Sequence, residues 1–310
     1  DVMVDAILDD LRGKEFDRII AVGGGTVIDI AKVLTVAKST DRVDDLYDRM
    51  ANLEKEHELI IVPTTCGTGS EVTNISIINR TTKGVKVGLV SPAMFADEAA
   101  LVPGMLLSLP YPVFATSSID AMVHAVESYL SPNACALSEL FSAKALHLIL
   151  SCWKDAVAAG GKDAWKKHAL EFLRASNYAG IAFGHAGCAA VHAMAYPLGG
   201  VHHIPHGQAN QLMFADVMRK YQEKKPIGKL NQLEELLGAE LDVEPVFSLE
   251  NLYKLMDEVL KKDPLHEHGV TADELPVFAK NVIETQQRLL GNNYVELTED
   301  DLLDIYRKAF

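Results

Sequence analysis

The chain has 310 residues, of which 48% are hydrophobic and 23% charged, as in ordinary folded globular proteins. Its 43 acidic and 29 basic residues give a formal charge of −14. No basic run exceeds two residues, so the sequence lacks the basic footprint that a duplex-binding protein needs. No apolar stretch approaches the roughly 20 residues that span a bilayer, and four scattered cysteines argue against a disulfide framework or a thiolate metal site. We therefore expect a cytoplasmic protein of two domains, with no nucleic-acid and no membrane partner.

The first hundred residues alternate short β-branched runs with glycine-rich turns and amphipathic stretches, which predicts an α/β layer. We expect buried strands at 18–22 and 58–62, a helix at 27–38, and a hairpin of residues 75–78 and 85–90 around a turn at 81–84.

Long amphipathic segments dominate from about residue 109 onward. They predict helices at 117–130, 137–159, 164–184, 209–221 and 251–260. Two prolines, Pro110 and Pro112, break any element that continues from the first part. We therefore expect an α/β domain over residues 1–109 and an all-α domain over residues 110–310.

Two polar loops follow the predicted strands. Gly23-Gly24-Gly25-Thr26 lies between a strand and a helix, where glycines let the backbone approach a ligand and the helix start offers unpaired N–H groups to an anion. It is neither a Gly-x-Gly-x-x-Gly nor a Walker loop, and a plain tight turn is the alternative. The second loop, 63–71, places hydroxyl side chains at the carboxyl end of a strand, where ligands gather in open α/β sheets. It too could be a simple capped turn, but the two loops together favour a nucleotide site.

Histidines cluster in the second part of the chain. Five of the 11 histidines fall within 185–206, and Asp120 and His124 have the spacing that places two side chains on one face of a helix. With His192 and His206 they would form a set of one carboxylate and three imidazoles, which suits divalent iron or zinc better than calcium or magnesium. Any one of these histidines alone would be interpreted as a core or surface residue.

Three other residues are weaker candidates. Glu71 and Glu127 could act as general bases, although a solvated or capping glutamate is the commoner outcome. Nothing in the sequence lowers the pKa of Cys66, which we interpret as a small packing residue.

Four stretches resemble motifs of the iron-containing (group III) alcohol dehydrogenases and occur in the order of that family: 23–32, 64–71, 120–127 and 192–207. Weaker similarity runs from Asp1 to Phe310, and residues 297–302 resemble the closing helix of the family. The resemblance implies a Rossmann-like nucleotide domain followed by a helical metal-binding domain. Because the family normally begins with a further strand and helix, and this chain begins with Asp, we expect the first units to lie upstream of residue 1.

The resemblance also implies which residues hold the cofactors. A metal, Fe²⁺ or alternatively Zn²⁺, would be held by Asp120, His124, His192 and His206. NAD or NADP would be bound by Gly23, Gly24, Gly25, Thr26, Asp29, Thr64, Thr65, Thr68 and Lys86.

The sequence departs from the family pattern at one position near the nicotinamide. Tyr196 stands where several members carry a histidine. Its phenol replaces the imidazole in the proton path, or His203 serves, or the proton is exchanged through water. The choice between NAD and NADP depends on an acidic residue in the segment that we expect upstream.

The implied activity is reversible hydride transfer between a primary alcohol and its aldehyde. Residues 189–206 are most similar to the 4-hydroxybutyrate dehydrogenase branch, which interconverts 4-hydroxybutyrate and succinate semialdehyde. Alternatives are butanol, lactaldehyde or 1,3-propanediol, a sister-family glycerol dehydrogenase, and a non-catalytic metal-binding protein. The family is commonly dimeric or larger, so we expect a homodimer or higher homo-oligomer.

Overall fold

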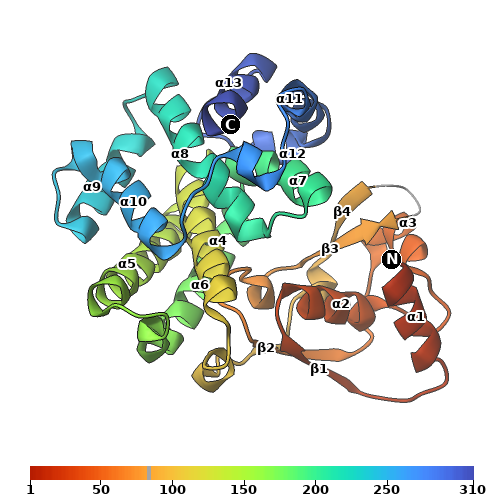
Figure 1. Cartoon of the computed structure of the whole chain (residues 1–310). Coiled ribbons are helices and arrows are strands. Elements are labelled where there is room, and N and C mark those ends of the chain that lie inside the picture. The colour runs from red at the N-terminus through yellow and green to blue at the C-terminus, as the bar shows by residue number, and fades with distance from the viewer. Residues whose placement is uncertain (82–84) are drawn as a thin grey trace.

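The structure is a computed structural model that describes residues 1–81 and 85–310, with only the backbone of residues 85 and 86. The first part comprises α1 (Val2–Leu11), β1 (Arg18–Gly23), α2 (Gly25–Val36), α3 (Val43–Asp48), β2 (Glu58–Pro63), β3 (Ile75–Arg80), β4 (Val85–Val90) and β5 (Glu98–Ala99). The second part comprises α4 (Tyr111–Leu130), α5 (Ala136–Ala159), α6 (Ala169–Ala186), α7 (Ala190–His202), α8 (His206–Lys224), α9 (Lys229–Leu241), α10 (Pro245–Val259), α11 (Glu274–Thr285), α12 (Gln287–Leu290) and α13 (Glu299–Ala309). The strands and α1–α3 lie on one side of the molecule and the later helices on the other (Figure 1). None of the described helices is long and apolar enough to traverse a lipid bilayer.

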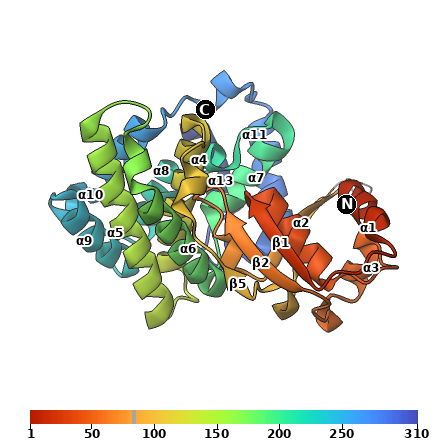
Figure 2. The same ribbon diagram turned by 90° about the horizontal axis from the view of Figure 1, so that it is seen from below.

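Strands β1, β2 and β5 form a parallel sheet in the order β1-β2-β5, with α2 packed against it (Figure 2). The register pairs Gly23 with Pro63. The loops that leave the carboxyl ends of β1 and β2 therefore start side by side.

The expectation of a buried first strand holds for one face only. Ala21 and Gly23 are buried, whereas Ile20 is 60% exposed and Val22 is 50% exposed. Side chains alternate between the two faces of a strand. One face of β1 packs against Ile28 of α2, and the other faces solvent.

The predicted hairpin is confirmed as the antiparallel pair β3–β4, with Ile75 opposite Val90. This pair is a separate two-stranded sheet. Residues 82–84 of its turn lie outside the described part of the chain. Ile78 and Leu89 pack with apolar residues of α1, α2 and α3 in a second small core.

The predicted change to helices is also confirmed, and α4 runs through the centre of the helical part, against α5, α6 and α8. Helix α4 carries Pro112 in its first turn. Proline has no backbone N–H, which is tolerated there because the first N–H groups of a helix have no intrahelical acceptor. The helix expected over 164–184 is divided into a 3-10 turn, Ala164–His168, and α6. That turn places Trp165 in the core, where it stacks on Phe114 with 4.0 Å between ring centroids.

Candidate metal and nucleotide site

A cavity of about 660 Å³ lies between the polar loops of the sheet and helices α4, α6, α7 and α8. The residues predicted from sequence that line it are Gly25, Thr26, Asp29, Thr65, Thr68, Asp120, His124, His192, Tyr196 and His206. Among the described residues, Gly23, Gly24, Thr64 and His203 do not line this cavity. The side chain of Lys86 lies outside the described part of the chain.

The loop of residues 23–26 (the glycine loop) and the loop of residues 63–71 (the threonine loop) contact each other at the end of the sheet. The backbone N–H of Thr64 donates to the carbonyl of Gly23 at 3.0 Å. A Cβ atom on Gly25 would lie 2.9 Å from Cγ2 of Thr68, so a larger residue would not fit between the loops. Helix α2 begins at Gly25, earlier than predicted, and no side chain caps it. Its first N–H groups therefore lack an intrahelical acceptor and can bind an anion.

A buried lysine ties α2 to the end of the second loop and to the start of β3. Lys32, on α2, has no exposed surface, and its Nζ donates to Ser70 Oγ at 2.8 Å, Thr73 Oγ1 at 2.9 Å and the carbonyl of Ile75 at 2.9 Å. Burial lowers the pKa of Lys32 to about 8, against the opposing effect of the carboxyl groups of Asp29 and Glu71. Sequence analysis assigned Lys32 no role. Lys32 lies between apolar residues on the buried face of α2, and this position in the sequence could have indicated that its amine is buried.

Asp29 joins the same network. Its Oδ1 accepts from Ser70 Oγ at 2.9 Å and its Oδ2 accepts from the N–H of Ile77 at 3.0 Å. Asp29 thus lines the cavity and also ties α2 to the threonine loop and to β3. Glu71 is buried beside Asn177, which donates to it at 3.1 Å, so the expectation of a solvated glutamate is wrong.

The predicted metal ligands converge from three helices. Asp120 and His124 lie one turn apart on α4, His192 lies on α7, and His206 is the first residue of α8. Asp120 Oδ1 is 3.4 Å from Nε2 of His192 and 3.5 Å from Nε2 of His206. The ring of His124 stacks on that of His192, with 4.5 Å between centroids.

The second loop, 63–71, contacts the predicted metal ligands directly. Nδ1 of His124 donates to the carbonyl of Gly67 at 3.3 Å. A Cβ atom on Gly67 would lie 2.6 Å from the carbonyl oxygen of Ser117, so the threonine loop packs against α4 through backbone atoms. The hydrogen bond leaves Nε2 of His124 as its free ring nitrogen.

Close helix packing positions His206. A Cβ atom on the next residue, Gly207, would lie 1.8 Å from the carbonyl oxygen of Thr116 on α4. Only glycine allows α8 to begin this close to α4, and this approach places His206 beside Asp120.

The charges of Asp120, His124 and His192 differ. Burial alone would raise the pKa of Asp120, but the neighbouring imidazoles hold it well below its ordinary value. Burial lowers the pKa of His124 to about 3, so its imidazole is neutral. Burial also opposes protonation of His192, but the carboxylates of Glu127 and Asp120 raise its pKa to about 9.

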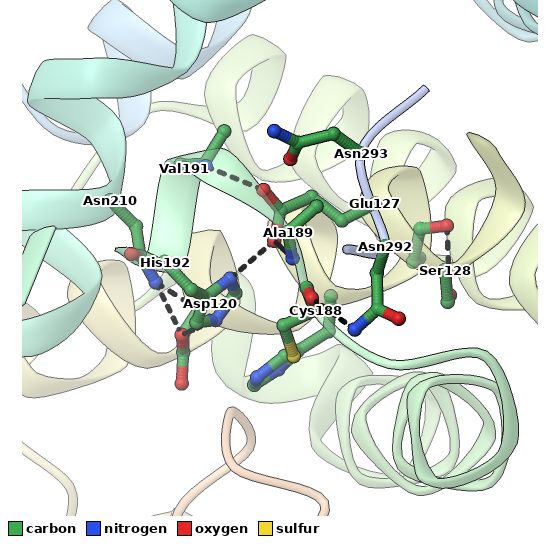
Figure 3. A network of polar contacts seen from close by, with 12 residues as sticks. Asp120, Glu127, Ser128, Cys188, Ala189, Val191, His192, Asn210, Asn292 and Asn293 are labelled. Atoms are coloured by element: carbon green, nitrogen blue, oxygen red, sulfur yellow. Dashed lines mark hydrogen bonds and ion pairs between the residues drawn. The ribbon is translucent and has the colours of Figure 1, made fainter. Parts of the chain in front are cut away.

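Glu127 is the capping glutamate that was one of the expected outcomes, and it also contacts a predicted metal ligand. Its carboxylate is 1% exposed and accepts from the N–H groups of Ala189 at 2.8 Å and Val191 at 2.6 Å, and from Nδ1 of His192 at 2.6 Å (Figure 3). It therefore caps the start of α7 from α4, and it turns Nε2 of His192 toward Asp120. The signal was present, because Glu127 lies seven residues after Asp120 on the same helix face.

Asn210 was also missed. It lies one helical turn after His206 on α8, and its Nδ2 donates to Asp120 Oδ1 at 2.8 Å and lies 3.2 Å from Nε2 of His192. Its Oδ1 is buried without a hydrogen-bond partner in the described part of the chain.

A cysteine lies beside the histidines, which sequence analysis did not anticipate. One ligand atom each from Asp120, His192 and His206 lie within 4.8 Å of one another, and the same holds for His124, Cys188 and His192. Burial and the nearby carboxylates of Glu127 and Asp120 hold the pKa of the Cys188 thiol well above its ordinary value, so the thiol is protonated.

The structure separates the two residues considered for proton transfer. Tyr196 lines the cavity, and its ring centroid is 6.1 Å from that of His206. Burial raises the pKa of the Tyr196 phenol. His203 ends α7 in a left-handed conformation, with a φ of 55°, and its side chain is exposed.

Comparisons with known proteins agree with this architecture. Residues 1–103 match the family model described as iron-containing alcohol dehydrogenase, and residues 114–310 match the model of the C-terminal part of the Fe-containing alcohol dehydrogenase family. A 4-hydroxybutyrate dehydrogenase of Clostridium kluyveri is 46% identical over 310 residues, which is 100% of this chain and 83% of that protein.

Two further proteins show lower sequence identity. A long-chain-alcohol dehydrogenase of Geobacillus thermodenitrificans is 36% identical over 96% of this chain and 76% of its own length. The crystal structure of a 1,3-propanediol oxidoreductase superposes with a TM-score of 0.85 and 28% identity, over 100% of this chain and 81% of that one.

Proposed function

The chain belongs to the iron-containing alcohol dehydrogenase family, and from this premise we propose that it interconverts 4-hydroxybutyrate and succinate semialdehyde with NAD or NADP. The observation that carries the proposal is the convergence of Asp120, His192 and His206, with His124 stacked beside them, on the cavity that the glycine and threonine loops also line. The substrate itself is proposed from the similarity to the Clostridium kluyveri enzyme.

The residues at this site fit a divalent metal. One carboxylate and three imidazoles form a mixed oxygen and nitrogen donor set that suits Fe²⁺ or Zn²⁺. The carboxylate of Asp120 is charged and the imidazole of His124 is neutral, as ligands must be, whereas His192, whose pKa is raised to about 9, would release its proton when the metal binds. Glu127 would orient His192, and Asn210 would orient Asp120, as partners of metal ligands do.

The loops likewise fit a dinucleotide. Gly25 and Thr26 at the uncapped start of α2 would hold the pyrophosphate, with Thr65 and Thr68 beside them in the same cavity. Gly23, Gly24 and Thr64 would contribute through the packing of the two loops. The buried amine of Lys32 ties α2 to Ser70 of the second loop and to Thr73.

The metal supplies Lewis acidity toward the alcohol oxygen, and the nicotinamide supplies the hydride acceptor. The chain's own residues do the rest. Asp120 and Glu127 place negative charge around His192, which orients that ring toward the cavity. Tyr196 is the residue that we place on the proton path, because it lines the cavity and His203 does not. The phenol, kept protonated by burial, can donate and accept a hydrogen bond at the substrate oxygen.

We further propose that residues 1–109 and 110–310 are two domains with the cavity between them, and that the protein is a cytoplasmic homodimer or larger homo-oligomer. Separate apolar cores in the first part support the division, and four free thiols fit a reducing compartment. Sedimentation of the purified chain tests its oligomeric state.

The test is an activity screen of metal-loaded protein with NAD and NADP against 4-hydroxybutyrate, 1-butanol, 1,3-propanediol, lactaldehyde and glycerol. We expect oxidation of 4-hydroxybutyrate with the highest kcat/KM and about one metal ion per chain. Brisk oxidation of butanol without oxidation of 4-hydroxybutyrate would reject the substrate. Metal without any turnover would favour a non-catalytic metal-binding protein.

A further inference from the structure

One cationic side chain at the cavity is not used by the proposed mechanism. Arg288, on α12, is the only Lys or Arg among the described residues that line the cavity. Its side chain is exposed and makes no hydrogen bond or ion pair with any residue that the structure describes.

The backbone of Arg288 is anchored next to the metal-ligand cluster. Nδ2 of Asn292 donates to the carbonyl of Cys188 at 2.9 Å (Figure 3). It also donates to the carbonyl of Arg288 at 3.2 Å. Sγ of Cys188 lies within 4.8 Å of ring nitrogens of His124 and His192. Asn292 also accepts from Asn133 at 2.8 Å, so its amide is held from both sides. This clamp keeps α12 against the loop that carries Cys188.

Arg288 lines the same cavity as the predicted metal ligands and Tyr196. Its neighbour Leu289 and the anchoring residue Asn292 line this cavity too. The anchored backbone therefore places a cationic side chain on the cavity wall beside the loop that carries Cys188.

We propose that Arg288 is the specificity-determining residue that binds the carboxylate of a short ω-hydroxy acid while its hydroxyl lies at Asp120, His192 and His206. The inference rests on the proposed function, because it names the residue that would recognise the acid end of that substrate. A planar guanidinium matches a carboxylate with two parallel hydrogen bonds. An alcohol without the acid group has no partner there.

The test compares 4-hydroxybutyrate with 1,4-butanediol, which has the same chain length and no carboxylate. In Arg288→Gln we expect the ratio of kcat/KM for the acid to that for the diol to fall about 10- to 100-fold. Arg288→Lys should retain part of the ratio, because it keeps the charge and loses the planar fork. In the wild type, KM for the acid should rise with NaCl while KM for the diol stays constant.

Two control variants locate the effect. Arg307→Gln removes an exposed arginine of α13 away from the cavity, and His185→Gln removes another basic side chain that lines it. Neither should change the ratio. An unchanged ratio in Arg288→Gln, or an equal fall in His185→Gln, would overturn the assignment and leave the proposed function standing.

A binding measurement separates the two proposals. Butyrate, measured by calorimetry on the metal-loaded protein, should bind the wild type and bind Arg288→Gln at least about tenfold more weakly. If the wild type does not oxidise 4-hydroxybutyrate but shows this loss of butyrate binding, the substrate proposal fails and the carboxylate site stands. If butyrate binds both proteins equally, the role of Arg288 is rejected.

Discussion

Glu127 and His192 form the contact on which the candidate metal centre depends. The carboxylate of Glu127 lies 2.6 Å from Nδ1 of His192, and the same carboxylate caps the first N–H groups of α7. One side chain on α4 therefore sets both the position of α7 and the rotation of the imidazole that α7 carries.

Replacing Glu127 by Gln should weaken metal binding. The amide cannot accept from all three donors, and its own NH₂ group faces at least one of them. We expect about a 10- to 100-fold loss of metal affinity and about 1–3 kcal/mol of lost stability from the unsatisfied N–H groups. Competition with a chelator and thermal unfolding of the apo-protein measure the two effects. Glu258→Gln, an exposed change on α10, is the control. Wild-type metal affinity in Glu127→Gln would contradict the orienting role.

His206→Ala should remove the metal and the turnover together. His206 supplies one of three ligand atoms, with Asp120 and His192, that lie within 4.8 Å of one another. Three ligands hold a divalent ion much more weakly than four. Elemental analysis of protein purified without chelators measures the loss. His147→Ala, an exposed histidine of α5 that pairs with Glu240, should keep the metal. Cys188→Ser should also keep it, and loss of metal in that variant would instead point to the set of His124, Cys188 and His192.

Tyr196→Phe should lower kcat with little change in metal content. The variant keeps the ring beside His206 and removes only the hydroxyl. We expect a decrease of about 10- to 100-fold if the phenol assists proton transfer. His203→Gln, at the exposed end of α7, should retain wild-type kcat. The opposite pattern would place His203 on the proton path after all.

Lys32 should make stability depend on alkaline pH. Its pKa is about 8 in the folded chain and about 10.5 in the unfolded one, so between these values the unfolded chain binds more protons. Relative to Lys32→Met, the wild type should gain stability as pH rises through this window, by at most about 3 kcal/mol. Below pH 8 the cost of burying the charge is fully present.

Urea unfolding of both proteins at about pH 7.5, 9 and 10.5 measures this difference. Lys144→Met, an exposed change on α5, is the matched control and should show no such slope. If the free energy of unfolding of the wild type minus that of Lys32→Met stays constant or falls as pH rises, burial of a charged Lys32 is contradicted.

Sequence analysis located the parts of the site that depend on local spacing. Asp120 and His124 share a helix face because four residues make about one turn, and the two loops meet because they leave parallel strands. Its errors concern contacts between helices. Glu127 looks like an ordinary polar helix residue until α7 is seen to begin against it. Helix α7 itself contains Pro197, which argues against a helix when only the sequence is read. Arg288 lies on the four-residue helix α12, whose place at the cavity depends on Asn292 and Cys188.

The hydrogen bond between the Gly67 carbonyl and His124 has a thermodynamic consequence. The carbonyl belongs to the loop that we propose for the dinucleotide and the imidazole to the proposed metal ligands, so each ligand would restrict a group that the other ligand needs ordered. Any factor by which the dinucleotide tightens metal binding must equal the factor by which the metal tightens dinucleotide binding. The two cofactors should therefore be held cooperatively, and the protein should lose its metal more readily once its dinucleotide has left.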